Sequence, residues 1–144
     1  MYKIVLCTIN ARYIHSSIGL RYLFANLNEL QSSSVIHEYD LTQSFSEIVE
    51  KILKVNPKII GFGVYIWNAE ETSKVIRLIK KISPETKIIL GGPEASYTPF
   101  RVDLSAADYI IQGEGDVTFY KICKNILDGI IPKERMIKGE VPDV

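Results

Sequence analysis

Four short segments of the sequence carry polar residues or glycine in a way that suits ligand binding. They are NARYIHSSIG (10–19), YIWNAE (65–70), GGPEASY (91–97) and QGEGD (112–116). A glycine pair costs backbone entropy on folding, so it tends to stand where a side chain would block a tight turn or a close approach. We therefore predict a site at which small residues leave room for a broad ligand.

Each of the four segments comes at the end of an apolar run that predicts a β-strand. The predicted strands cover residues 2–9, 35–41, 58–66, 86–92 and 108–113. Such uniformly apolar runs are typical of parallel strands that are buried on both faces. Because the carboxyl ends of parallel strands share one edge of the sheet, the four segments should meet there.

Helical patterns separate these strands. The predicted helices cover residues 18–30, 44–55, 68–82 and 116–127. Ser44 and Glu47 form a capping box, and Asn68 is placed to cap the third helix, whose apolar stripe extends to Ile82. Residues 93–107 contain two prolines and little periodicity, which favours an irregular connection with room for one helical turn.

This alternation predicts an α/β fold, a flavodoxin-like (Rossmann-like) three-layer αβα sandwich. Right-handed crossovers give a five-stranded parallel sheet, for which the order 2-1-3-4-5 is expected. Residues 1–128 would form this domain. Residues 129–144 contain prolines and alternating charges without a helical period, so they indicate a linker or an edge hairpin that leads to a further domain.

The composition excludes several classes of function. Seventeen basic and seventeen acidic residues give a net charge of zero, which disfavours nucleic-acid binding. No apolar run is long enough to insert into a membrane. Cys7 and Cys123 lie within apolar runs, as buried reduced thiols do, and this indicates a cytoplasmic location. Nothing in the sequence specifies an oligomeric state.

Taken singly, each candidate segment also has a structural explanation. Gly91 and Gly92 with Pro93 can form a tight strand-to-helix turn, and residues 113–116 can form a turn followed by a helix cap. Trp67 is the only tryptophan, and it can contact a ligand or partner or pack against the sheet edge. The acidic residues Glu94, Glu114 and Asp116 suit helix starts better than they suit catalysis.

The sequence resembles the cobalamin-binding domain that precedes the catalytic barrel in many radical S-adenosylmethionine (SAM) proteins. This group includes relatives of the anaerobic magnesium-protoporphyrin monomethyl ester cyclase. The matching segments span most of residues 11–116. They read ARYIHSSIGLRYLFANL, IGFGVYIWNAEET, IILGGPEASY and DYIIQGEGD.

The resemblance implies that cobalamin lies over the carboxyl ends of the strands, with its nucleotide tail between the sheet and the helices. Gly63 and Tyr65 stand at the family's Ser-x-Leu-type position, and Gly91 and Gly92 at its paired-glycine position. We infer one set of cofactor-binding residues from the four segments. The set is Arg12, Tyr13, His15, Ser16, Gly63, Tyr65, Trp67, Asn68, Gly91, Gly92, Pro93, Glu94, Gly113, Glu114 and Gly115.

Two departures from the family pattern affect this expectation. In the motif Asp-x-His-x-x-Gly the histidine binds cobalt, but around His15 the sequence has Tyr13 for the aspartate and Ile18 for the glycine. Because His15 lacks the carboxylate that orients a ligating imidazole, we do not expect it to bind cobalt. Gly63 replaces a frequent serine and removes one hydroxyl group from the tail-binding site.

A radical SAM reaction requires three cysteines at C-x-x-x-C-x-x-C spacing to hold a 4Fe-4S cluster, and this sequence has only two cysteines. We therefore expect the cluster and S-adenosylmethionine to bind in a barrel elsewhere in the same polypeptide, with this chain as the cobalamin-holding module. The alternative is a degenerate flavodoxin-like domain that has lost the cofactor and contacts the barrel or another protein. A flavin-binding flavodoxin is less favoured because ARYIHSSIG lacks the glycines of a phosphate loop.

Overall fold

The computed structural model describes residues 2–10, 18–96 and 98–140. Its elements in chain order are β1 (Ile4–Asn10), α1 (Ile18–Ala25), the 3-10 helix η1 (Asn28–Ser33), β2 (Ser34–Asp40), α2 (Phe45–Lys54), β3 (Ile59–Gly63), α3 (Ala69–Ile82), β4 (Lys87–Gly91), α4 (Pro93–Ser96), β5 (Tyr109–Gln112), α5 (Asp116–Leu127) and β6 (Met136–Lys138). All the strand pairs are parallel.

In the described residues the sheet has six strands in the order β2-β1-β3-β4-β5-β6. The α/β architecture and the order of the first five strands are as predicted, but the count of five is wrong. Residues 136–138 pair parallel to β5 and extend the sheet by one edge strand. The sequence did not reveal this strand because three residues are too few to display a period.

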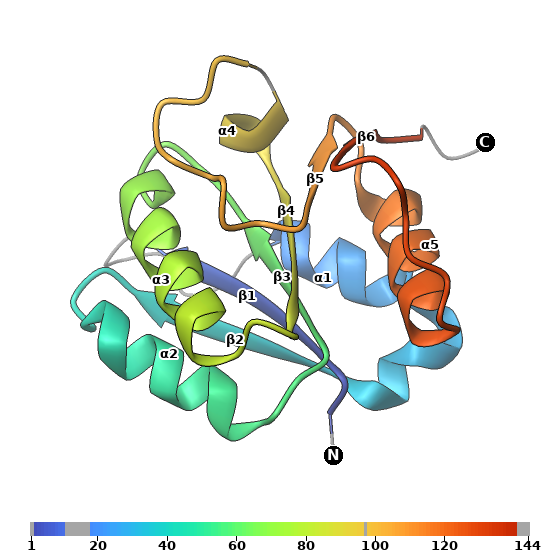
Figure 1. The fold of residues 1–144 in the computed structure, drawn as a ribbon, viewed down its shortest axis with the longest axis horizontal. Coiled ribbons are helices and arrows are strands. Elements are labelled where there is room, and N and C mark those ends of the chain that lie inside the picture. The colour runs from blue at the N-terminus through green and yellow to red at the C-terminus, as the bar shows by residue number, and fades with distance from the viewer. Residues whose placement is uncertain (1, 11–17, 97, 141–144) are drawn as a thin grey trace.

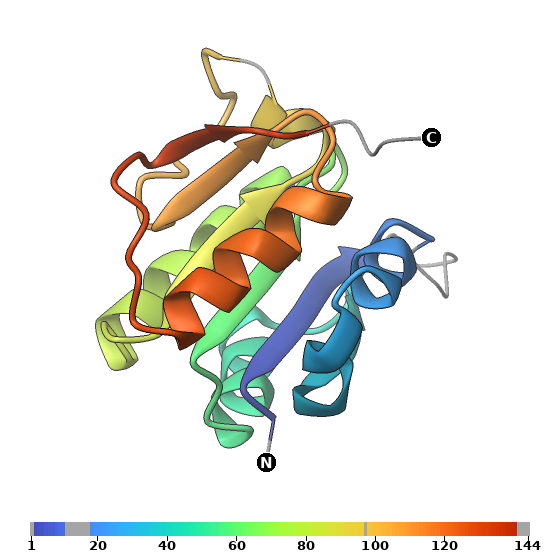
Figure 2. The same ribbon diagram turned by 90° about the vertical axis from the view of Figure 1, so that its right-hand side faces the viewer.

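Helices cover both faces of the sheet (Figures 1 and 2). Strand side chains alternate between the faces, so β1 directs Val5, Cys7 and Ile9 into the core beneath α2 and α3. It directs Ile4 and Leu6 into the core beneath α1, η1 and α5. The structure is therefore the predicted three-layer sandwich.

One helix is shorter than predicted, and in another the apolar stripe ends earlier than predicted although the helix has its predicted extent. The first helix ends at Ala25, because Asn28 takes a left-handed backbone conformation with φ of 51° and the chain continues as η1. The apolar stripe of α3 ends at Ile79, since Ile82 is the last residue of the helix and is 60% exposed. The capping box is confirmed, with Ser44 accepting a hydrogen bond from the Glu47 amide.

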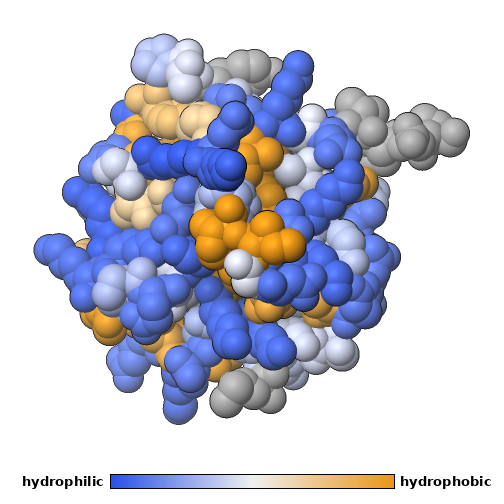
Figure 3. Space-filling view, turned by 45° about the vertical axis from the view of Figure 1, so that its right-hand side comes forward, coloured by the Kyte–Doolittle hydropathy of each residue, from blue (hydrophilic) through white to orange (hydrophobic). Residues whose placement is uncertain are grey.

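Charged and polar side chains cover most of the face drawn in Figure 3, with apolar side chains in smaller patches between them. None of the helices in the described part of the chain is both long and apolar enough to cross a membrane. Both cysteines are buried and unpaired, as predicted. Burial raises the pKa of the Cys7 and Cys123 thiols, so both stay protonated.

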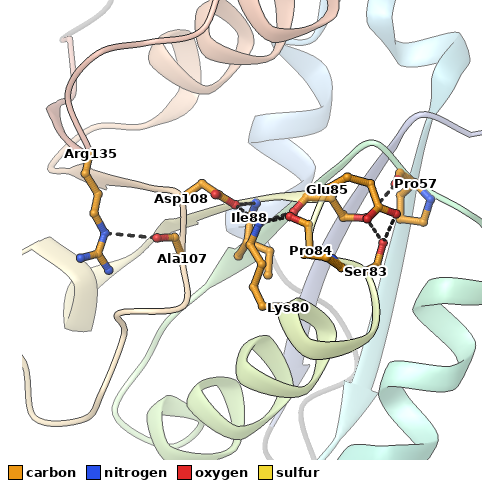
Figure 4. Close-up of polar contacts among 10 residues, drawn as sticks. Pro57, Lys80, Ser83, Pro84, Glu85, Ile88, Ala107, Asp108 and Arg135 are labelled. Carbon is orange, nitrogen blue, oxygen red and sulfur yellow. Dashed lines mark hydrogen bonds and ion pairs between the residues drawn. The ribbon is translucent and has the colours of Figure 1, made fainter.

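A polar network joins α3 to the amino ends of β4 and β5 (Figure 4). Lys80 Nζ lies 2.6 Å from Asp108 Oδ2 and also donates to the Thr86 carbonyl at 2.6 Å. The same Asp108 oxygen accepts a hydrogen bond from the Ile88 amide at 2.8 Å. Arg135 donates to the carbonyl groups of Leu104 and Ala107, which holds the chain just before β6. This network fixes the end of the sheet away from the strands' carboxyl ends.

We predict that Asp108→Ala lowers the free energy of unfolding by about 1–3 kcal/mol, because it leaves the Ile88 amide without its side-chain acceptor. Asp108→Asn is the matched control, since it keeps an oxygen for that amide and should lose less. Urea denaturation followed by circular dichroism measures both. Equal stability of Asp108→Ala and the wild type would contradict the role given to this network.

Candidate functional site

A cleft of about 380 Å³ opens where β3, β4 and β5 end, on the face of the sheet that carries α1 and α5. Its apolar walls come from Leu20 and Leu23 of α1 and from Ile89 and Ile111 of the sheet. Its mouth is formed by the loops that follow the strands. The mouth residues are Gly63, Tyr65, Gly91, Gly92, Pro93, Ser96, Gly113, Glu114, Gly115 and Asp116.

The space in this cleft results from glycines on one face of neighbouring strands. Gly63 and Gly91 are aligned partners in the β3–β4 register, and Gly113 directly follows β5. Ile89 points into the core beneath α1 and α5, so Gly91, two residues later, faces the same side. A Cβ atom added at Gly91 or Gly113 would meet no heavy atom within 4 Å beyond the adjacent residues, and at Gly113 the φ of +86° also favours glycine. These two glycines therefore leave open volume at the cleft mouth.

Gly92 is a glycine for a different reason. Its φ is +98°, and an added Cβ would lie 2.7 Å from the Val64 carbonyl oxygen and 2.9 Å from the Val64 nitrogen. The Val64 amide donates to the Gly91 carbonyl, and the Glu94 amide donates to the Val64 carbonyl. Gly92 thus permits a tight crossing of two loops, whereas its neighbour Gly91 provides space.

Phe119 and Gly61 close the deep end of the cleft. An added Cβ at Gly61 would lie 2.8 Å from two atoms of the Phe119 ring, which is 2% exposed. The sequence analysis selected neither Phe119 nor Gly61 as a site residue. The signal was present in the spacing of Gly61 and Gly63 in IGFG, because glycine in a strand often marks close approach of another group.

The aromatic residues after β3 form a stacked pair beside the mouth. The rings of Tyr65 and Trp67 are nearly parallel, at an angle of 4°, with centroids 4.7 Å apart. Trp67 is 40% exposed and Ile66 is 63% exposed. An added Cβ at Gly63 would lie 3.1 Å from the Tyr65 ring, so a serine at position 63 would require that ring to shift.

Asn68 does not cap α3, contrary to prediction, since its side chain makes no capping hydrogen bond. It is fully buried, and its Oδ1 accepts from the Tyr65 amide at 2.8 Å. Its Nδ2 donates to the carbonyl groups of Ile9 and Gly63. The side chain therefore ties the loop after β3 to the end of β1 and holds the aromatic pair in place.

The acidic residues at the mouth have separate environments. Glu94 forms an ion pair with Arg101 at 3.5 Å, while Glu114 is exposed. Partial burial, together with the negative charge of Glu114, raises the pKa of Asp116. Pro93 is exposed at the start of α4. In residues 2–10, 18–96 and 98–140, no group of three or more His, Cys, Asp or Glu side chains is placed to hold a metal ion.

The structure thus brings Gly63, Tyr65, Gly91, Gly92, Pro93, Gly113, Glu114 and Gly115 to one cleft mouth. Glu94 and Trp67 lie on the same loops, and Asn68 lies beneath them. Ser96 lines the cleft although it was not predicted to do so. Four predicted residues, Arg12, Tyr13, His15 and Ser16, fall outside the described residues.

Proteins of similar sequence are methyltransferases. An uncharacterized methyltransferase of Pyrococcus horikoshii is 27% identical over 85% of this chain and 26% of its own length. The cobalamin-dependent radical SAM methyltransferase TokK of Streptomyces tokunonensis is 30% identical over 47% of this chain and 10% of its own length. This chain therefore spans about a quarter or less of the length of these relatives.

Solved structures with a similar fold include a cobalamin-binding protein and an enzyme solved with cobalamin bound. A cobalamin-binding protein from Desulfitobacterium hafniense matches with a TM-score of 0.58 and 21% identity, over 86% of this chain and 58% of that one. TsrM, a radical SAM methyltransferase from Kitasatospora setae solved with cobalamin and a 4Fe-4S cluster, matches with a TM-score of 0.62 and 18% identity, over 90% of this chain and 25% of that one. The family model described as the B12 binding domain matches residues 4–122. The chain belongs to the B12 binding domain family.

Proposed function

We propose that this chain is a cobalamin-holding module and that the cleft at the carboxyl ends of β3, β4 and β5 takes the cofactor. The observation that carries this proposal is the open volume at Gly91, where the side chain of any other residue would project toward the cleft that this glycine lines. Membership of the B12 binding domain family supports it independently.

The residues that line the cleft fit the chemistry of a corrinoid. Leu20, Leu23, Ile89 and Ile111 offer an apolar wall, which suits the aromatic base of a nucleotide tail. The carboxylates of Glu114 and Asp116 stand at the mouth, where they would accept hydrogen bonds from the amide groups that a corrinoid carries on its rim. The exposed Trp67, stacked on Tyr65, offers a flat apolar surface beside them.

The bound cofactor would supply organometallic chemistry that no amino-acid side chain offers. We propose that a radical SAM barrel of the same polypeptide uses it, with its own 4Fe-4S cluster and S-adenosylmethionine. The methyltransferase relatives, which are much longer than this chain, support that arrangement. In this division of labour the residues of the present chain bind and orient the cofactor, and Asn68 and Gly92 keep the mouth loops in position.

The direct test is a titration of the purified chain with hydroxocobalamin, followed by equilibrium dialysis and visible absorbance. We expect saturable binding of one cofactor per chain. Trp67 is the only tryptophan, so its fluorescence should be quenched over the same concentration range. Absence of binding at cobalamin concentrations up to roughly several hundred micromolar would favour the degenerate interaction domain instead.

A larger side chain inside the cleft should weaken this binding without unfolding the protein. We predict that Gly91→Leu weakens cobalamin affinity by about tenfold or more, while unfolding free energy changes by less than about 1 kcal/mol. Gly91→Ala, with one methyl group, should show a smaller loss of affinity. If Gly91→Leu bound cobalamin as tightly as the wild type, the cofactor would not occupy this space.

The adjacent glycine should behave in the opposite way. Gly92→Ala is predicted to lower unfolding free energy by about 1–3 kcal/mol, because its φ of +98° and its contact with Val64 both disfavour a Cβ. Thermal or urea denaturation of Gly91→Ala and Gly92→Ala side by side measures the difference. Equal stability of the two variants would show that the pair does not divide its roles as we propose.

We do not expect His15 to coordinate cobalt, because the sequence around it lacks the aspartate that orients a ligating histidine. We therefore predict that His15→Ala leaves the visible absorption spectrum of bound cobalamin unchanged. A shift of that spectrum in His15→Ala, at full occupancy, would identify His15 as the lower ligand.

A further inference from the structure

The segment that begins with β6 packs on the outer side of a loop that forms part of the cleft mouth. We define the C-terminal strap as residues 136–140, which comprise β6 together with Gly139 and Glu140. Within the strap, Met136 packs on the core beneath α2 and α3, and Ile137 packs on the core beneath α1 and α5. Arg135 anchors its amino end through the carbonyl groups of Leu104 and Ala107. The strap is thus fixed before it reaches the strand ends.

At its other end the strap lies directly on the loop after β5. The Gly139 amide donates to the Gln112 carbonyl at 2.8 Å, which continues the β5–β6 pairing by one residue. A Cβ at Gly139 would collide with the Glu114 carbonyl oxygen and lie 2.9 Å from the Glu114 nitrogen. Position 139 therefore accepts only glycine while the loop keeps its present place.

Two further contacts hold the strap against α5. The Glu140 amide donates to Thr118 Oγ1 at 2.9 Å, and Thr118 is 4% exposed. The Glu140 carboxylate forms an ion pair with Lys121 at 2.7 Å. Because Thr118 is buried, its hydrogen bond fixes the position of the strap more firmly than the exposed ion pair does.

The loop in question, residues 113–115, has little rigidity of its own. Gly113 has a φ of +86°, Gly115 is a second glycine, and Glu114 between them is exposed. On the cleft side, Ser96 Oγ accepts a hydrogen bond from the Gly113 amide and donates to the Gly92 carbonyl. On the outer side, Gly139 is in contact with Glu114. The loop is therefore held between Ser96 and the strap.

We propose that the C-terminal strap is a positioning element of the cleft: Gly139 and the Glu140–Thr118 hydrogen bond set the place of residues 113–115, and hence the shape of the mouth that receives the cofactor. None of the strap residues lines the cleft itself. The effect on cofactor binding rests on the function proposed above, whereas the effect on the loop does not. Preorganised loops bind more tightly because less ordering entropy is lost on binding.

The experiment uses the whole chain with two variants that loosen the strap in different ways. Gly139→Ala forces the strap and the loop apart, and Thr118→Val removes the acceptor of the Glu140 amide with little change in side-chain volume. Gly129→Ala is the matched control. Its φ of +82° makes alanine costly for stability, but the residue is not among those that line the cleft.

Two measurements are made on each variant. Backbone ¹⁵N order parameters of Gly113, Glu114 and Gly115 are recorded without cofactor, and the affinity for hydroxocobalamin is determined by equilibrium dialysis. We expect the loop order parameters to fall from about 0.85 toward 0.6 in both strap variants. We expect their affinity to fall by about tenfold. Gly129→Ala should retain wild-type values of both.

The outcomes separate this proposal from the proposed function. The strap proposal is overturned if the order parameters of residues 113–115 are unchanged in both strap variants. It is also overturned if a variant with lowered loop order parameters binds cobalamin as tightly as the wild type. An equal loss of affinity in Gly129→Ala also overturns it, because general stability would then explain the effect. If the wild type binds no cobalamin, the proposed function fails, and the order parameters alone decide whether the strap positions the loop.

Discussion

The site depends on one steric constraint: near the carboxyl edge of the sheet, glycines occupy the strand positions that face one side, and larger residues occupy those that face the other. On the face beneath α2 and α3, the core continues to the strand ends through Phe62, Val64 and Leu90. On the opposite face the alternate positions are Gly61, Gly63 and Gly91. Because the strands are parallel and in register, these absences lie next to one another. Phe119 of α5 fills the space beside Gly61 and the Tyr65 ring lies beside Gly63, whereas the space beside Gly91 stays open. A cleft results where a continuous core would otherwise form.

A wall built from glycine needs support from its surroundings, since it has few side chains with which to pack. The loops after the strands obtain that support from backbone contacts and from buried polar groups. Asn68 satisfies three backbone groups from beneath the loop after β3. Gly92 locks the next loop against Val64, and Ser96 connects it to Gly113. The glycines create the volume, and these hydrogen bonds keep its shape.

Much of this arrangement could be predicted from the sequence, because it follows from local patterns. Uniformly apolar runs predicted the parallel strands, and the pair Gly91-Gly92 indicated the rim of the site. The division of roles within that pair could not be predicted, since it depends on Val64, which reaches Gly92 only in the folded chain. The same is true of Gly61, whose partner Phe119 lies on another element.

Other features were missed because tertiary contacts outweighed a local rule. Asn68 has the sequence position of a helix cap, yet its amide satisfies the backbone groups of two strand ends instead. The three residues of β6 carry no readable period, and they form a strand because β5 presents an unpaired edge next to them. In both cases long-range hydrogen bonding decided the conformation, and such bonding leaves little trace in a single sequence.

The location of the cofactor is tested most directly by amide chemical-shift mapping of the ¹⁵N-labelled chain with and without cobalamin. The account predicts that the largest shifts occur at Gly63, Gly91, Gly113 and Gly115, which line the cleft, while Gly129 and the amides of α2 and α3 stay unchanged. Shifts concentrated over α2 and α3, or a bound cofactor that leaves the four cleft glycines unperturbed, would contradict it.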